Sequence, residues 1–435
     1  MLKRKILTID DEAGFTKVVK LTLEMNDSYE ALRSTSVWLV IFAGLCICGL
    51  AHAQVANQNE VWLAPRTDGQ PGTGTATDPF NVSTQPMFDA LLTGYFKNNT
   101  QNVTFNLTAG TYYSMGQLGG WTCLSNWKFY GAGMDTTVIK MSGYSYGVTG
   151  TQQSGGNCVF TAMPWFETGI EITDLTIDCS WLNFGTTLSG SFTVPAQSGT
   201  VSVPVVSSTW ATVGKYAYIQ RMDTYQVVGI YLVTSVPNGK NVVLQNLQGS
   251  DGNAAGNLPT GTLVSGTAVF VGPAVDTCGI DIGAKDCEVE RVHVTDSGTP
   301  IPECALGIQM GQANSSNPSG DPFELGDGNI ISGCLIDNLW GSAGWCIATV
   351  STNPAGNTGT FISAIVQDNV IHSNGMHQGL SSWGTASSTW TNNTVSNCAV
   401  GWFVDVGYNQ DAQIINNIFE NNGTAIQLGG GYVNG

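Results

Sequence analysis

Apolar residues five positions apart recur along the chain and give the first indication of its architecture. Asn369, Asn393 and Asn417 repeat every 24 residues, and each lies in a short apolar segment. A fixed period of this kind is typical of a solenoid, in which each coil packs only against its neighbours. The pairs that share the five-residue spacing are Ile172/Ile177, Val289/Val294, Ile330/Leu335, Val366/Ile371, Trp390/Val395 and Ile414/Phe419.

A second apolar alternation follows these pairs after about nine residues and predicts a further strand in each coil. We therefore expect two strands per coil, with coils stacked about 4.8 Å apart around one continuous core. The three asparagines would form a hydrogen-bonded ladder at equivalent turns, and this turn-forming role is favoured over a catalytic one. The second strands are marked by Leu306/Ile308, Trp345/Ile347, Gln378/Leu380, Trp402/Val404 and Ile426/Leu428.

The coil rhythm breaks between Ile177 and Ile280. Residues 185–273 contain short alternating segments and clusters of turn residues, which predict a small antiparallel β module. Since Ile280 resumes the frame, we expect this module to be inserted into one coil. Residues 54–184 would then hold the N-terminal cap and first coils, and residues 274–435 the C-terminal coils.

The last coil has no amphipathic segment after Leu428 that would cover its open edge. Exposed strand edges invite pairing with another chain. We therefore expect either further sequence beyond this coil or self-association through it.

The N-terminal segments resemble the first coils of pectate-lyase-superfamily proteins. The resemblance rests on Val61–Phe80, a predicted amphipathic helix at Gln85–Phe96, and the segments FNLTAGTYY and NWKFYGAGMDTTVIKM. It covers about 55–184 and 274–435. It implies an all-β fold, a right-handed parallel β-helix, with a helix covering the edge of the first coil. It implies little about activity.

An apolar run at Val37–Leu50 is too short for a comfortable membrane span and is followed by Ala51 and Ala53. Small residues at this spacing suit signal peptidase. We interpret residues 34–53 as a signal peptide cleaved before Gln54, with a membrane anchor as the alternative. The mature protein would be secreted, periplasmic or on the cell surface, without a stable membrane span.

Residues 3–29 resemble the opening strand and helix of a response-regulator receiver domain. They include the acidic pair Asp10 and Asp11, which in that family helps hold Mg²⁺. The resemblance ends near Arg33, before the phospho-accepting position. Residues 1–33 are therefore interpreted as a remnant, and no phosphorelay is inferred.

Composition narrows the class of partner. The formal net charge is −17, only 11% of residues are charged, and no Lys or Arg follows Arg291. Phosphate binding requires basic side chains, so this balance argues against nucleic acid. The fold resemblance instead favours a polysaccharide as the partner.

Nine of the 11 cysteines lie outside the predicted signal peptide. They show no spacing typical of a zinc site, so buried core thiols are expected. Because nine is odd, at least one thiol would remain free or pair with another molecule. Cys123 with Cys158 is the disulfide that we would test first.

Strand alternation assigns residues to the outer face of the coils. Trp402 and Val404 share the inward side, so Phe403 and Asp405 would face outward. Aligning Val404 with Leu380 predicts an outward column of Asp281, Gln309, Ala348, Ser381 and Asp405. Asp281 and Asp405 would be four coils, about 19 Å, apart and could not act as one carboxylate pair.

Two long turns, 311–328 and 350–360, are predicted to form the walls of a cleft. Acidic residues near aromatic side chains suit sugar chemistry, because rings stack on aromatics while an acid and a base cleave the glycosidic bond. A solvated acidic loop is the simpler interpretation of any one of these residues. The candidate catalytic residues are Asp327, Glu324 and Asp405; the candidate substrate-binding residues are Trp383, Phe403, Tyr408, Gln309 and His377.

Motifs of related families help to rank the possible activities. Polyuronate lyases of this fold generally use Ca²⁺ and an Arg or Lys as the base, but no Lys or Arg follows Arg291. Polygalacturonase-like motifs are reduced to Gly326-Asp327-Gly328. A glycoside hydrolase is therefore favoured over a lyase, and a non-catalytic surface, adhesion or tail-fibre-like protein is the alternative. No cofactor is predicted, although the acidic loop leaves Ca²⁺ open.

Overall fold

The computed structural model describes residues 58–143, 157–162, 167–179, 184–221, 227–247, 258–273, 277–296, 304–312, 327–339, 345–351, 363–373, 378–383, 388–404 and 412–428. The predicted signal peptide and the receiver-like segment lie outside these ranges. No helix within them is long and apolar enough to cross a membrane.

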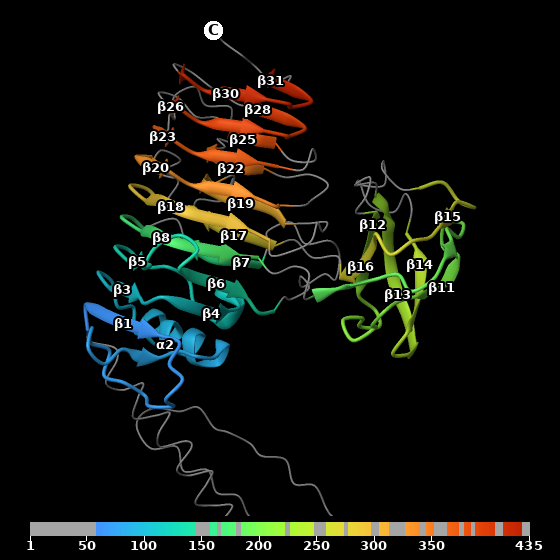
Figure 1. The fold of residues 1–435 in the computed structure, drawn as a ribbon, viewed down its shortest axis with the longest axis horizontal. Helices are drawn as coiled ribbons and strands as arrows, with labels where there is room; N and C mark the ends of the chain where they lie inside the picture. Colours follow the sequence, from blue (N-terminus) through green and yellow to red (C-terminus); the bar gives the residue numbers. More distant parts are fainter. Residues whose placement is uncertain are drawn as a thin grey trace, which may run out of the picture. The chain divides into compact units, whose positions relative to one another are not determined.

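The chain forms a right-handed parallel β-helix whose coils stack in sequence order (Figure 1). One line of parallel strands begins at β2 (Phe80–Asn81) and β1 (Glu60–Ala64). It continues through β3 (Thr104–Leu107), β5 (Lys128–Tyr130), β8 (Glu171–Asp178), β18 (Glu288–Thr295), β20 (Asn329–Ser332), β23 (Ala364–Gln367), β26 (Thr389–Thr391) and β29 (Gln413–Ile415).

Two further lines of strands complete the coils. The second belongs to the same 16-stranded sheet and contains β4 (Gly110–Ser114), β6 (Thr137–Met141), β21 (Leu335–Asp337), β24 (Val370–His372), β27 (Thr394–Ser396) and β30 (Ile418–Glu420). The third forms a seven-stranded sheet of β7 (Asn157–Ala162), β17 (Thr277–Ile282), β19 (Cys304–Gln312), β22 (Trp345–Ser351), β25 (Gln378–Trp383), β28 (Val400–Val404) and β31 (Thr424–Leu428).

The complete C-terminal coils therefore contain three strands, where two were predicted. In these coils the five-residue pairs span a corner between two strands, as with Val366 on β23 and Ile371 on β24. The earlier pairs Ile172/Ile177 and Val289/Val294 each lie within one long strand, β8 and β18. The chain bends because Asp368, Asn392 and Asn416 adopt positive φ angles of 57°, 57° and 54°. Asp and Asn tolerate this left-handed conformation better than other residues with a Cβ atom.

Two predicted registers are wrong. The inward pair next to Val289 and Val294 is Ile331/Ile336, not Ile330/Leu335. Both pairs are apolar and five residues apart, so spacing alone could not separate them. In the following coils the partner of Leu380 is Trp402, not Val404, so that alignment was shifted by two residues.

The asparagine ladder is confirmed. Asn369 Nδ2 donates to Asn393 Oδ1 at 2.9 Å, and Asn393 Nδ2 donates to Asn417 Oδ1 at 2.9 Å. The same oxygens accept the backbone N–H groups of Asn369 and Asn393. Asn369 and Asn393 are fully buried. The ladder therefore satisfies polar groups inside the stack of coils, which apolar side chains could not do.

Helix α2 (Gln85–Lys97) matches the predicted amphipathic segment, and Pro86 lies in its first turn. Its buried apolar residues recur at helical spacing and join the core of the β-helix; they are Phe88, Leu91, Leu92 and Tyr95.

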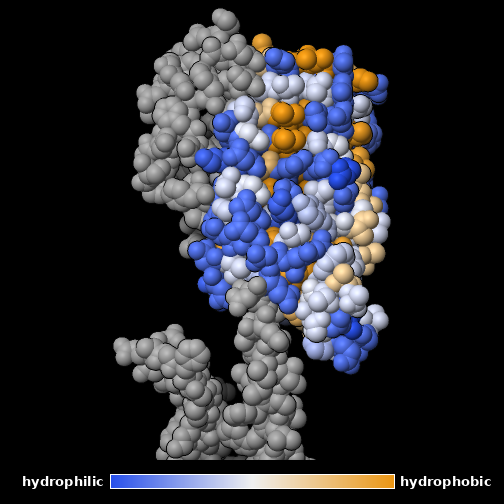
Figure 2. Space-filling model, turned by 90° about the vertical axis from the view of Figure 1, so that its left-hand side faces the viewer, coloured by the Kyte–Doolittle hydropathy of each residue, from blue (hydrophilic) through white to orange (hydrophobic). Residues whose placement is uncertain are grey.

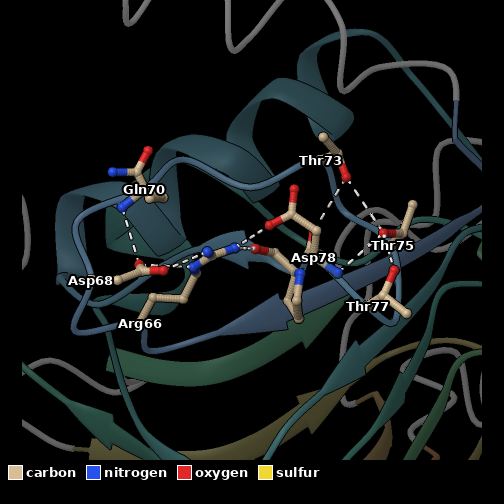
Figure 3. Close-up of polar contacts among 8 residues, drawn as sticks. Arg66, Asp68, Gln70, Thr73, Thr75, Thr77 and Asp78 are labelled. Carbon is tan, nitrogen blue, oxygen red and sulfur yellow. Dashed lines mark hydrogen bonds and ion pairs between the residues drawn. The ribbon is translucent and has the colours of Figure 1, made fainter.

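The loop before α2 is fixed by Arg66. Figure 3 shows its guanidinium group between Asp68 and Asp78, and Nη1 also donates to the Pro79 carbonyl at 3.0 Å. The hydrogen bond from Arg66 lowers the pKa of Asp68 to about 2. Gly72 is required here, because its φ is +74° and a Cβ would lie 1.9 Å from the Pro79 oxygen. This glycine-rich loop thus has a structural role.

The inserted segment forms an antiparallel module, as predicted. A six-stranded sheet runs in the order β11-β14-β13-β12-β16-β9, and β10 pairs with β15. It has its own apolar cluster, which includes Val203, Tyr231 and Leu244. The strands are β9 (Thr186–Thr187), β10 (Phe192–Thr193), β11 (Thr200–Pro204), β12 (Tyr216–Arg221), β13 (Val227–Asn238), β14 (Asn241–Asn246), β15 (Leu263–Val264) and β16 (Val269–Pro273).

The candidate disulfide between Cys123 and Cys158 is absent, because Cys123 is a free thiol. Cys123 belongs to the main core, whereas Cys158 on β7 lies beside Cys278 of β17. Burial raises the pKa of the Cys287 and Cys334 thiols to about 12. These two thiols are therefore protonated at neutral pH and behave as small core residues.

Apolar side chains become exposed toward the C-terminal coils. Figure 2 shows hydrophobic residues in the upper part of the face it presents, whereas the lower coils there are mainly polar. The exposed aliphatic residues of the last three described strands are Ile414, Ile415, Ile418, Ile426 and Leu428. Self-association through this coil remains a prediction.

Candidate functional site

The outer face of the seven-stranded sheet carries the predicted column, and Asp281 is the titratable side chain among its described members. Strand register aligns Thr161, Asp281, Gln309, Ala348, Ser381, Phe403 and Gln427. Phe403 therefore takes the place that the sequence alignment gave to Asp405. The two-residue shift arose because Trp402 and Val404 are both buried and point to the same side.

Asp281 is nearly buried, with 8% of its surface exposed. Its Oδ1 accepts a hydrogen bond from Gln309 Nε2 at 2.8 Å. Burial raises the pKa of Asp281 to about 6, although the hydrogen bond from Gln309 acts in the opposite direction. A carboxyl group with this pKa exchanges its proton near neutral pH, as a general acid or base must.

Thr161 lies next to Asp281 on the preceding coil. Its hydroxyl oxygen is buried and has no hydrogen-bond partner in the described part of the chain. Buried polar atoms normally have a partner. A hydroxyl beside a protonatable carboxyl group therefore points to a polar ligand or water at this position.

Gln309 and Phe403 stay partly exposed on the same column. They are separated by three coil steps, about 14 Å. An extended polymer could therefore contact the amide at Gln309 and the aromatic ring at Phe403 together. Ala348 and Ser381 between them are fully buried.

Asp327, a predicted catalytic residue, lies in the turn before β20. Its Oδ1 accepts hydrogen bonds from both the backbone N–H and the hydroxyl of Ser363, each at 2.7 Å. Its carbonyl accepts the Asp286 N–H at 2.8 Å. These bonds connect successive coils, so the structure gives Asp327 a turn-stabilising role, and a catalytic role stays a prediction.

The other predicted site residues cannot be placed together. Glu324, Asp405, Tyr408 and His377 lie outside the described residues. Trp383 ends β25, but its side chain also lies outside the description.

A second polar cluster lies on the 16-stranded sheet. His293 Nδ1 lies 2.8 Å from Asp135 Oδ1, and its Nε2 lies 2.9 Å from Asp337 Oδ1. Burial lowers the pKa of His293, but the hydrogen bonds with Asp337 and Asp135 outweigh it, and the net pKa is raised above 6.5. Both ring nitrogens are occupied, so this cluster connects coils on either side of the insertion rather than transferring a proton to a substrate.

This cluster predicts a pH-dependent stability. The raised pKa of His293 contributes stability below pH 6.5, which is lost as the pH rises through the folded-state pKa. The pKa of Asp337 is lowered, because hydrogen bonds from His293 and Thr295 outweigh burial, so its contribution is lost only well into acid. We expect the melting temperature of the wild type to decrease as the pH rises above about 6.5.

In the His293→Gln variant the fall should be smaller. His372→Gln is the matched control, because His372 lies beside Asp337 on the next strand and has Ser396 as its partner. An equal fall in wild type and His293→Gln would exclude His293 as the titrating group.

The described residues contain no group of three or more His, Cys, Asp or Glu side chains suited to a metal ion. The acidic loop lies largely outside those residues, so Ca²⁺ binding there is untested.

Comparison with known proteins gave likenesses of structure only. No family model matches the chain, and no curated protein matches it. The A-module of an Azotobacter vinelandii mannuronan C-5 epimerase is 12% identical, with 82% of this chain and 76% of that chain covered and a TM-score of 0.31.

Two other solved structures have similar scores. A tailspike protein of E. coli bacteriophage HK620, solved with a pentasaccharide, is 12% identical, with 92% of this chain and 50% of that chain covered and a TM-score of 0.42. A Yersinia enterocolitica family 28 exopolygalacturonase is 11% identical, with 85% of this chain and 64% of that chain covered and a TM-score of 0.29. At these identities the likeness concerns the β-helix fold and not an activity.

Proposed function

We propose that this protein is an exported enzyme that hydrolyses a polysaccharide on the outer face of the seven-stranded sheet. The observation that supports it is Asp281, a buried carboxyl group with a pKa of about 6 that is hydrogen-bonded to Gln309. An exposed carboxyl group at neutral pH would have lost the proton that a leaving sugar needs.

In this proposal Asp281 is the general acid. It donates its proton to the glycosidic oxygen as the bond from that oxygen to the anomeric carbon breaks. Water supplies the new hydroxyl group, and a second carboxylate removes the proton of that water. Glu324 and Asp327 are the candidates for the second carboxylate, because Asp405 is expected four coils, about 19 Å, from Asp281. Gln309 orients Asp281, and the Phe403 ring offers a face on which a sugar ring stacks.

Replacing Asp281 by Asn tests this assignment. Reducing ends released from a panel of neutral and acidic polysaccharides should fall about 100-fold or more, while affinity gel electrophoresis should show retained binding. Asp368→Asn is the matched control, because Asp368 lies on an exposed turn and accepts a bond from Asn392. It should retain wild-type activity.

Two results would contradict the proposal. Undiminished activity in Asp281→Asn would remove Asp281 as the acid. If the wild type binds a polysaccharide but releases reducing ends from none of the polymers, the protein is better explained as a non-catalytic surface or adhesion protein.

A further inference from the structure

A hollow of about 460 Å³ lies on the turns that lead into three successive strands of the seven-stranded sheet. Its lining includes residues from the β24–β25, β27–β28 and β30–β31 connections. These are His372, Ser373, Asn397, Cys398, Asn421 and Gly423. None of them belongs to the Asp281 column.

Ser373 provides the clearest sign of a ligand. The residue is 1% exposed, and its hydroxyl oxygen has no hydrogen-bond partner in the described part of the chain. It nevertheless lines the hollow. A buried hydroxyl without a partner is unfavourable unless something in the hollow supplies the bond.

His372 contacts polar side chains beside the hollow. Its Nδ1 lies 3.0 Å from Ser396 Oγ and 3.2 Å from Asn397 Nδ2, and its Nε2 lies 3.4 Å from Asn397 Nδ2. Ser396 Oγ also donates to the Ile371 carbonyl at 3.2 Å. The His372 ring therefore helps to position the Asn397 amide at the hollow.

Asn397 and Asn421 occupy equivalent turn positions with φ of 54° and 53°. Their amides offer both donors and acceptors, while Ala399 supplies a small apolar surface. None of the lining residues carries a permanent charge, and the sequence contains no Lys or Arg after Arg291. This combination suits a ligand with many hydroxyl groups and no charge.

We propose that this hollow is a binding site for an uncharged saccharide, separate from the Asp281 site. The sugar hydroxyls would bond to Ser373 Oγ and to the amides of Asn397 and Asn421, and the sugar C–H groups would contact Ala399. The inference does not require catalysis, so it stands whether or not Asp281 is an acid.

Saturation-transfer NMR and calorimetry on the exported chain test it, with cellobiose, maltose, lactose and N,N′-diacetylchitobiose as neutral probes and digalacturonate as the charged probe. At least one neutral disaccharide should bind, and digalacturonate should bind more weakly. Ser373→Ala, Asn397→Gly and Asn421→Gly should each weaken binding about three- to tenfold, the loss of one neutral hydrogen bond.

Glycine at positions 397 and 421 preserves the positive φ, so these variants remove the amide without straining the turn. Asn392→Gly is the matched control, because Asn392 has the same backbone conformation on another turn. It should bind like wild type.

Three outcomes would contradict the proposed site: none of the neutral probes binds, all three variants bind as tightly as the wild type, or digalacturonate binds as tightly as the neutral disaccharides. Loss of disaccharide binding only in Asp281→Asn would reject this hollow and would place the disaccharide at the Asp281 column instead. If the three variants bind more weakly while Asp281→Asn binds like the wild type, the hollow is a saccharide site that does not depend on the Asp281 site.

Discussion

Replacing Trp402 by alanine should lower the free energy of unfolding by about 3 to 5 kcal/mol. Trp402 is 4% exposed and lies between Leu380 and Ile426 of the neighbouring coils. Its ring packs against Trp390 with 5.6 Å between ring centroids. Truncation would leave a large cavity inside a close-packed stack, and neighbouring coils cannot collapse into it without breaking strand pairing.

Phe403→Ala is the matched control for this prediction. Phe403 is adjacent in sequence but lies on the outer face and is partly exposed, so its loss should cost much less. Urea denaturation monitored by circular dichroism gives both values. Equal destabilisation by the two substitutions would mean that the strand faces are assigned incorrectly.

The inward direction of Trp402 could be predicted from the sequence because strand side chains point to opposite faces in turn. The pairing of its strand with the neighbouring coil could not be predicted, because Trp402 and Val404 lie on the same face and either residue fits the apolar pattern. A similar ambiguity led to the choice of Ile330 instead of Ile331 as the residue that faces the core. Patterns therefore predicted the β-helix, its inserted module and its ladder, while alignment between coils required backbone pairing.

The site was less predictable than the fold. Asp281 was placed on the outward column but given no role, because its burial and its bond to Gln309 depend on a neighbouring coil. A signal was present, since an acidic residue stands between two isoleucines, Ile280 and Ile282, that the pattern assigns to the core. For Asp327 the sequence suggested a catalytic role because the residue is acidic. In the structure its carboxylate instead accepts hydrogen bonds from Ser363.

The Asn393 side chain is the second residue whose loss should have a large effect. Its oxygen accepts from the Asn369 backbone at 3.1 Å and from the Asn369 amide at 2.9 Å. Its own amide donates to the Val366 carbonyl and to Asn417, each at 2.9 Å. The bonds to Asn369 and Val366 lie in the interior, where water cannot replace a lost partner, whereas the bond to Asn417 is only partly buried.

Asn393→Ala should therefore cost about 3 to 5 kcal/mol, because the Val366 carbonyl and the Asn369 N–H lose their partners in a buried environment. Asn392→Gly is again the control, since the neighbouring side chain is exposed and bonds only to Asp368 among the described contacts. Hydrogen exchange should also accelerate in β23 and β26, on both sides of the lost bonds, more than in β3 and β5. If Asn393→Ala unfolds at the same urea concentration as Asn392→Gly, the ladder contributes no net stability and the apolar core alone holds the coils together.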